Sequence, residues 1–289
     1  MKSVVYYSKK LTGSELVKLY DKLDIKLEGK VAIKLHSGEP GNQNFLGPDF
    51  FKPIIDRVGG TVVECNTAYD GKRNTTEKHL ETFHDHGWDV FDIDLMDAEG
   101  PDMVLDIPNG KVIKQNYVGK NLAKYDSMLV LSHFKGHPMG GYGGALKQLS
   151  IGIASGYGKA YIHGAGVPEN IWTANHDKFL ESMADAAGSV IEYFKGKIVY
   201  VNVMKNMSVD CDCCAVAEDP KMADIGVLIS TDPIAIDQAC IDLVYSSKDE
   251  GRKHLIERIE SRNGVHTIEA AAEHGYGSRE YELIDITKE

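Results

Sequence analysis

The sequence predicts an α/β fold in which flanking helices cover a mostly parallel, mixed sheet. Short apolar runs, typical of buried strands, recur along the chain, and amphipathic helical patterns lie between them. A strand, a helix and a further strand in this order form a crossover unit, which makes the two strands parallel. The chain has 289 residues, 43% of them hydrophobic, so it is long enough to enclose a large core.

The expected strands are short runs rich in valine, isoleucine and leucine, residues that suit a buried sheet. They are Val4–Tyr7, Val31–Leu35, Thr61–Cys65, Val90–Leu95, Met128–Leu131, Ile198–Val203 and Ile225–Ile229. The expected helices have apolar residues spaced by three and four, which places them on one helical face. They are Ser14–Leu23, Pro48–Val58, Thr75–His86 and His176–Phe194, of which the last has the clearest pattern.

Two further patterns complete the chain. The stretch Met103–Val118 holds two β-like runs around Pro108-Asn109-Gly110, which predicts a hairpin added to the sheet. Nearer the C-terminus, three helical patterns precede a last strand. They are Ile234–Tyr245, His254–Arg262 and Thr267–His274, and the strand is Tyr281–Ile286. We therefore expect one α/β domain over residues 1–289, whose C-terminal helices can form a small subdomain.

The composition limits the classes of partner. The formal net charge is -11, and such a surface repels nucleic-acid phosphates and anionic lipids, so we expect neither as a partner. A small anionic molecule remains compatible, because local lysines and arginines decide its binding. No apolar stretch approaches a membrane span, and the N-terminal apolar run is too short for a signal peptide. We expect a cytoplasmic protein with reduced cysteines.

Polar or glycine-rich loops follow five of the expected strands. In chain order they contain His36 with Glu39, Arg73, His133 with Lys135 and His137, the cysteines between 211 and 214, and Asp232. If all these strands are parallel, the five loops emerge at the carboxyl edge of the sheet, where open α/β sheets bind ligands. The sequence thus predicts one composite site at that edge.

The third of these loops is glycine-rich. Gly140, Gly141, Gly143 and Gly144 let backbone N–H groups approach a ligand, and the following helix adds partial positive charge. Lys147 lies one turn into that helix and can point at the same space. A tight packing turn explains the glycines alone, but the neighbouring histidines and lysines favour an anion or cofactor site.

We expect His36, His133, His137 and Lys147 to be catalytic, because histidine titrates near neutral pH and lysine can hold an anion. Lys135, Arg73 and Asp237 join the four glycines as expected cofactor-binding residues. Asp232 before Pro233 suits a helix cap, whereas capping does not explain Asp237 among apolar neighbours. For Arg73 and for Glu39, a structural salt bridge is as good an explanation as ligand binding.

Three of the five cysteines lie within four residues. Thiolates at Cys211, Cys213 and Cys214 suit zinc, iron or an iron–sulfur cluster, and Glu39 is a candidate oxygen ligand. The Cys-x-Cys-Cys spacing is not a ferredoxin-type four-cysteine motif, so a fourth ligand must come from elsewhere. The alternative is that the three thiols are buried and inert.

Four segments resemble the domain-of-unknown-function 362 family, often labelled iron–sulfur-centre proteins. They are Lys34–Asn42, Asn66–Asn74 with His79-Leu80, Ser132–Lys147 and Asp224–Gln238. Many relatives carry a ferredoxin-like insert, with two four-cysteine runs, after the region that matches Lys159–Pro168. Here Glu169–Asp177 contains no cysteine, so the resemblance implies a member without the insert. Only the Cys211-Asp212-Cys213 pattern carries over.

A shorter segment, Gly140–Ile153, is similar to the glycine-rich, lysine-bearing segment of the lactate racemase family. In that family the lysine tethers a nickel pincer cofactor and histidines transfer the proton or hydride. His137 and Lys147 would be the matching pair.

Three functions are compatible with these observations. The first is a metal- or iron–sulfur-associated enzyme of the redox or lyase type that acts on a small anionic ligand. The second is an enzyme of hydroxy or keto acids, distantly like lactate racemase, with Lys147 as the anchor. The third is a non-catalytic binding or assembly module for a ferredoxin-type redox partner that replaces the missing insert.

Overall fold

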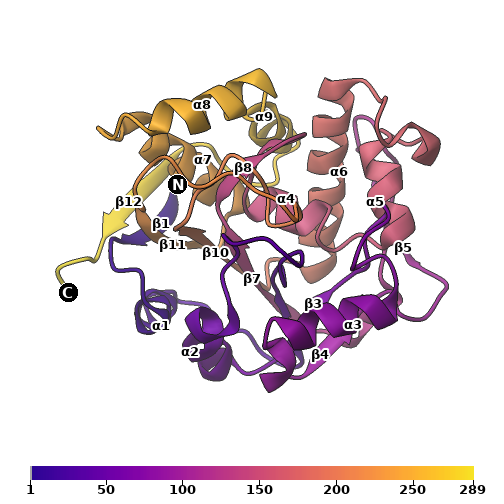
Figure 1. Ribbon diagram of the computed structural model, residues 1–289, viewed down its shortest axis with the longest axis horizontal. Helices are drawn as coiled ribbons and strands as arrows, with labels where there is room; N and C mark the ends of the chain where they lie inside the picture. The colour runs from indigo at the N-terminus through magenta and orange to yellow at the C-terminus, as the bar shows by residue number, and fades with distance from the viewer. Residues whose placement is uncertain (1) are drawn as a thin grey trace.

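The computed structural model describes residues 2–289 and confirms the α/β fold (Figure 1). Eight strands form one sheet in the order β12-β1-β11-β10-β7-β2-β3-β4. Their bounds are β1 Ser3–Ser8, β2 Val31–Lys34, β3 Thr61–Glu64, β4 Ile93–Leu95, β7 Ser127–His133, β10 Ile198–Met204, β11 Gly226–Ser230 and β12 Tyr281–Asp285. Neighbouring strands pair in parallel except at β11, which is antiparallel to both β1 and β10.

Helices bury both faces of the sheet. Consecutive side chains of a strand point to opposite faces, so each strand contributes to two apolar clusters. In β7, Leu129 and Leu131 pack in one apolar cluster with helices α1 (Gly13–Asp21) and α2 (Pro48–Val58). Met128 and Val130 pack in a second cluster on the other face. That cluster includes residues of α4 (Ala145–Ser150), α6 (His176–Phe194) and α7 (Pro233–Ser246), and Figure 1 shows the two helical layers on either side of the sheet.

The remaining helices are α3 (Thr76–Asp85), α5 (Gly156–His163), α8 (Arg252–Ser261) and α9 (His266–Glu273). Three short 3-10 turns lie at Trp88–Val90, Lys120–Lys124 and Pro168–Asn170. The strand expected over Val90–Leu95 begins only at Ile93, because the fully buried Trp88 forces a turn there and leaves Val90 63% exposed. Within residues 2–289, the helices lack the combination of length and apolar character that a membrane crossing needs.

The direction of β11 corrects the expectation that five loops share one edge. The connection from β10 to β11, residues 205–225, contains no helix, and Met204 pairs directly with Gly226. A chain that leaves one strand and enters the adjacent strand at the same edge must run back antiparallel. The loop after β11, with Asp232, therefore lies at the opposite edge, where Asp232 caps α7 and accepts a hydrogen bond from Ser3 Oγ.

The hairpin expected at Met103–Val118 forms but is not added to the main sheet. Its strands, β5 (Met103–Asp106) and β6 (Gln115–Val118), make a separate two-stranded sheet that packs on α5 and α6. The buried carboxylate of Asp185 in α6 accepts hydrogen bonds from the backbone N–H groups of Lys111, Val112 and Ile113. This bonding ties the hairpin to the helix. A second small sheet, β8 (Lys135–His137) with β9 (Gly141–Gly143), was not expected from the sequence.

Candidate functional site

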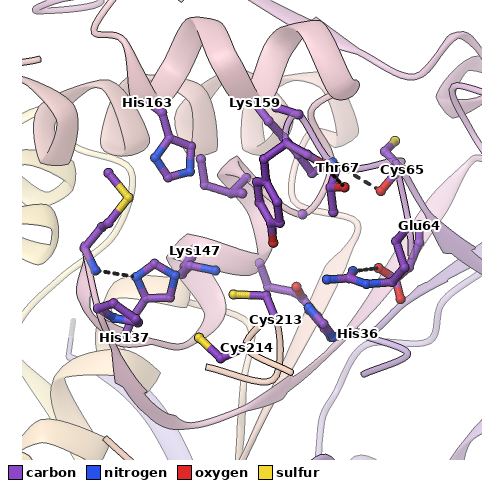
Figure 2. A pocket seen from close by; sticks show the side chains of 18 of the residues that line it. His36, Glu64, Cys65, Thr67, His137, Lys147, Lys159, His163, Cys213 and Cys214 are labelled. Atoms are coloured by element: carbon purple, nitrogen blue, oxygen red, sulfur yellow. Dashed lines mark hydrogen bonds and ion pairs between the residues drawn. The ribbon is translucent and has the colours of Figure 1, made fainter. Parts of the chain in front are cut away.

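A cavity of about 280 Å³ lies at the carboxyl edge of the parallel strands. His36 follows β2, Arg73 follows β3, His137 follows β7 and Cys213 follows β10, and all four side chains line the cavity. Lys147 of α4 lines it as well. Figure 2 shows His36, His137, Lys147 and the cysteines around this common space. Because these strands are parallel, the loops that follow them meet at one edge of the sheet. Side chains from distant parts of the chain therefore lie around one cavity.

The thiols of Cys211 and Cys213 lie close to His137. One potential ligand atom from each of the three residues falls within 4.8 Å of the others, so the group can hold a metal ion. A hydrogen bond from Cys213, and secondarily the charges of Lys147 and Lys135, hold the pKa of Cys211 well below its usual range. The same hydrogen bond raises the pKa of Cys213. The interaction thus favours the thiolate at Cys211 and the protonated thiol at Cys213, and Cys213 lowers the pKa of Cys214 as well.

His137 is held in one tautomer by the turn that follows it. Its Nδ1 accepts hydrogen bonds from the backbone N–H groups of Met139 (3.1 Å) and Gly140 (2.8 Å). Burial, with the charge of Lys147, lowers the pKa of His137 to about 4, so the ring is neutral and carries its proton on Nε2. Nε2 is thus a hydrogen-bond donor available to the thiolate or to a ligand.

His133 and Lys135 lie behind the cysteine loop rather than in the main cavity. Both contact the buried carboxylate of Asp212, at 2.9 Å from Nδ1 of His133 and 2.7 Å from Nζ of Lys135. Nε2 of His133 also faces the carbonyl of Lys205. Both ring nitrogens of His133 therefore face protein oxygen atoms and neither is free for proton transfer, although His133 and Lys135 do line a smaller adjacent cavity. His133 and Lys135 therefore hold the Cys211–Cys213 loop in place through its central residue, Asp212.

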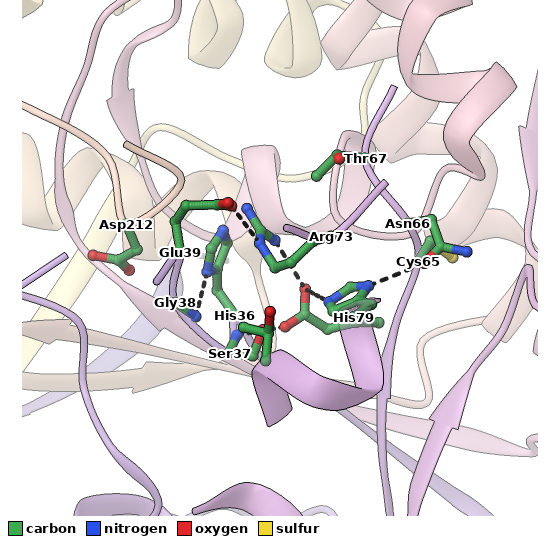
Figure 3. Close-up of polar contacts among 12 residues, drawn as sticks. His36, Ser37, Gly38, Glu39, Cys65, Asn66, Thr67, Arg73, His79 and Asp212 are labelled. Carbon is green, nitrogen blue, oxygen red and sulfur yellow. Dashed lines mark hydrogen bonds and ion pairs between the residues drawn. The ribbon is translucent and has the colours of Figure 1, made fainter. Parts of the chain in front are cut away.

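Glu39 and Arg73 form the salt bridge that was the alternative explanation for both residues. Nε of Arg73 donates to Glu39 at 2.7 Å, and the Arg73 side chain is 3% exposed. Nη1 of Arg73 lies 3.8 Å from Glu64, which is also 4.0 Å from Nζ of Lys34. Figure 3 shows Arg73 and Glu39 of this buried network. Glu39 is outside the group of His137 and the two cysteines, and its carboxylate neutralises Arg73.

His36 points one ring nitrogen at its own loop. Nδ1 accepts a hydrogen bond from the N–H of Gly38 at 3.0 Å, so the proton of the neutral ring lies on Nε2. Burial, and then the charge of Arg73, lower the pKa of His36 to about 3. His36 is therefore a neutral donor beside the cavity.

Asp237 does not face the cavity. Its carboxylate accepts hydrogen bonds from the N–H groups of Ala145 (2.7 Å) and Leu146 (3.0 Å), at the first turn of α4, and also from Tyr142 and Asn202. The N–H groups that were expected to meet a ligand are thus satisfied by protein. These contacts make Asp237 a cap for the first turn of α4 and do not indicate that it binds a cofactor.

The glycines are explained largely by close packing. A Cβ on Gly144 would lie 2.4 Å from Oδ1 of Asp237. Gly141 has φ +78, and a Cβ there would meet the backbone of Gly264 at 2.7 Å. Gly140 makes only ordinary contacts of this kind, whereas Gly143 and Gly144 line the smaller adjacent cavity. Close packing thus requires glycine at positions 141 and 144, whereas positions 140 and 143 have room for a Cβ.

A family model described as Domain of unknown function (DUF362) matches residues 31–242. The chain belongs to this family. The matched region contains every site residue described above, from the loop after β2 to Asp237 in α7. Among curated proteins, none matches the sequence.

Two solved structures are similar to this chain. The lactate racemase apoprotein from Thermoanaerobacterium thermosaccharolyticum has a TM-score of 0.50 and 16% identity, with 84% of this chain and 57% of that chain covered. A protein from Thermotoga maritima, a target of the Northeast Structural Genomics Consortium, has a TM-score of 0.45 and 14% identity, with 90% and 58% covered. The chain therefore spans less than two thirds of either protein. At these identities the likeness concerns the fold alone.

The structure of this family member adds three residues that the sequence patterns did not single out, Lys34, Glu64 and Lys159, which line the cavity. His163, a candidate for acid–base or ligand work from its expected place where a strand meets a loop, lines the cavity from the end of α5. Burial, followed by the charge of His137, lowers the pKa of His163 to about 3. Lys34 had a visible signal, because it interrupts an otherwise apolar strand as the last residue of β2. Lys159 had none, since a lysine on a short helix is ordinary.

Proposed function

We propose that this member of the domain-of-unknown-function 362 family is a metal-dependent enzyme of the redox or lyase type that acts on a small anionic substrate. The observation that carries the proposal is the group of His137, Cys211 and Cys213 beside a cavity that also holds cationic side chains. Sulfur and imidazole donors would bind the metal, and the cationic side chains of the same cavity would attract an anionic substrate that the metal activates.

The donor set fits zinc or iron, with the thiolates as the principal ligands. The lowered pKa of Cys211 favours the thiolate form that would bind a metal ion, and Cys213 would have to lose its proton to act as the second sulfur ligand. Cys214 lines the same cavity but lies outside the group of His137, Cys211 and Cys213. His137 becomes a ligand only if its ring turns, because its Nδ1 lone pair now faces two N–H groups. Without that turn, His137 donates its Nε2 proton to the bound ligand.

Lys147 supplies the charge next to the metal group. Its Nζ lies 4.0 Å from Sγ of Cys211, where it stabilises the thiolate. Once the thiolate charge is neutralised by a metal, the ammonium is available to an anionic substrate in the cavity. The metal would polarise a substrate oxygen, and the neutral rings of His36 and His137 would donate hydrogen bonds to the developing charge.

Metal analysis of protein purified without oxygen tests the proposal. We expect about one zinc or iron per chain, lost when Cys211→Ser and Cys213→Ser are combined. Cys240→Ala is the matched control, because Cys240 is fully buried in the core of α7 and does not line the cavity. Metal far below one equivalent in the wild-type protein, or equal metal in the double variant, would contradict the proposal.

A second candidate is the racemase-like enzyme of hydroxy or keto acids. It is favoured by the fold shared with lactate racemase over 84% of the chain, together with Lys147 and His137 on one cavity. If Lys147 anchors a cofactor covalently, intact-mass spectrometry of protein from a native-like host shows an adduct that Lys147→Arg abolishes. An unmodified mass rejects this version.

For either enzyme we propose a reducing compartment, the cytoplasm, as the site of action. All five cysteines are free, and three of them serve the proposed chemistry only as thiols.

A further inference from the structure

Lys159 is a buried ammonium that no carboxylate neutralises directly. The residue is 8% exposed and lines the cavity. Its Nζ donates to the backbone carbonyls of Ala154 (2.6 Å) and Cys65 (3.3 Å). Among residues 2–289, no carboxylate oxygen lies within the 4.0 Å that defines an ion pair with it. One of the three N–H bonds of the ammonium is therefore left for a ligand.

The charges around Lys159 are only partly balanced. Two cations, Lys34 and Arg73, face two carboxylates, Glu39 and Glu64, so this part of the network is neutral. Lys159 has no ion-pair partner of its own, and Asp97 and Glu64 act on its charge only from beyond ion-pair distance. A buried charge without a partner is strongly disfavoured, so proteins keep one where a ligand completes it.

Arg73 offers a second unused donor. Nε and Nη1 face Glu39 and Glu64, but Nη2 is buried and has no hydrogen-bond partner within residues 2–289. Arg73 and Lys159 line the same cavity, and Figure 2 shows Lys159 across that space from the sulfurs of Cys213 and Cys214. Lys159 thus lies away from the sulfur atoms of Cys213 and Cys214, and Arg73 adds a donor to the same cavity.

We propose that Lys159 and Arg73 clamp the carboxylate of a small monocarboxylic acid with an apolar body. The inference deepens the proposed function, on which it rests, by naming the substrate class of the same cavity. The clamp meets one negative charge with two N–H donors, whereas a phosphate dianion carries a second charge and a third oxygen that these two side chains do not meet. A guanidinium N–H and an ammonium N–H suit the two oxygens of a planar carboxylate.

The walls between the two ends of the cavity suit an apolar body. Met139, Ile151 and Ile171 line them. Tyr69 and Trp172 complete the lining, with ring centroids 6.2 Å apart, and Trp172 is 64% exposed, so it lies at the mouth. A cavity of about 280 Å³ has room for an acid of five to ten heavy atoms, on the order of 20–30 Å³ for each.

Calorimetry with 4-methylpentanoate tests the clamp, and 4-methylpentanamide is the matched probe without charge. We expect the acid to bind at least about tenfold more tightly than the amide, since one charged hydrogen bond is worth that much. Inorganic phosphate is the third probe and should bind more weakly than the acid. Equal binding of acid and amide would overturn the clamp, and tighter phosphate binding would overturn the substrate class.

Two variants test whether these side chains bind the carboxylate or only stabilise the fold. Lys159→Gln keeps an N–H donor for the carbonyls of Cys65 and Ala154 but removes the charge, and we expect it to lose the preference for acid over amide. Arg73→Lys should weaken acid binding by about tenfold or more. Circular dichroism and the melting temperature establish that each variant is folded. A folded Lys159→Gln that binds the acid like wild type would refute the role of Lys159.

The same proteins separate this inference from the proposed function. Lys159→Gln should retain its metal, whereas the Cys211→Ser, Cys213→Ser double variant should lose metal and still prefer the acid. Metal without acid preference in the wild type defeats only the clamp. Acid preference without metal defeats only the proposed function.

Discussion

The two sides of the cavity are built differently. On the thiol side, the two sulfur atoms of the candidate metal group belong to residues 205–225, a connection without helix or strand, which His133 and Lys135 hold through Asp212. On the cation side, Lys34 and Glu64 are the last residues of β2 and β3, strands that are paired on both sides within the sheet. A loop lets sulfur ligands adjust to a metal, whereas strand ends keep buried charges at set distances. The comparison predicts that the cation side contributes more to stability and the thiol side more to ligand exchange.

The largest effect should follow from Glu64→Gln. The change leaves Lys34 and Arg73 with one carboxylate between them, and an uncompensated buried charge costs about 3–5 kcal/mol. Urea unfolding measures the loss. Asp56→Asn is the control, because the Lys52–Asp56 pair is half-exposed and should contribute about 0–1 kcal/mol. Similar losses for the two variants would show that the cation side is not a stabilising network.

Asp212→Asn should cost less, about 1.5–3 kcal/mol, because the amide keeps one oxygen acceptor for His133 or Lys135. Its larger consequence is for the metal group, since Asp212 orients the loop between Cys211 and Cys213. We expect metal affinity to fall about 10–100-fold. Competition with a chromophoric chelator measures this change. Unaltered metal affinity would mean that the loop needs no support from behind.

Acid should destabilise the protein through both sides. Burial alone would raise the pKa values of Glu64 and Asp212, but neighbouring cations lower both below their usual values. Lys34 lowers the pKa of Glu64 from its usual 4.5, and His133 with Lys135 lowers that of Asp212 from its usual 3.8. The unfolded chain then takes up protons first, so stability present above about pH 4.5 is lost as pH falls. Unfolding free energy measured between pH 3 and pH 6 should decline less steeply in Glu64→Gln. An unchanged slope would remove Glu64 from the explanation.

The smallest effect, about 1 kcal/mol, is expected for Asp237→Asn, which weakens the cap on α4. Its pH dependence has the opposite sign. Burial raises the pKa of Asp237 from 3.8 to about 6, so the folded state binds the proton more readily and stability falls as pH rises through this range. The variant should lack that fall. If Asp237 binds a cofactor instead, the variant would change ligand affinity and leave the pH dependence of the apoprotein as it was.

Local patterns were enough for most of the fold. The helices Pro48–Val58 and His176–Phe194 begin and end at the predicted residues, because an amphipathic period is written in the segment itself. Parallel order followed from the alternation of strands and helices, and it placed His36, Arg73, His137 and Cys213 at one edge. The direction of β11 escaped prediction, since a strand has no local mark of its partner's direction.

What the sequence by itself determined is the set of residue types and the edge of the sheet at which they meet. Only the tertiary structure decided how each side chain is used. It turned Asp237 into a cap, paired Glu39 with Arg73, and left one ammonium, Lys159, without a carboxylate. The reason is physical: a helix or strand is encoded by neighbours in the chain, whereas the charge balance of a buried site depends on distances between segments that only folding brings together.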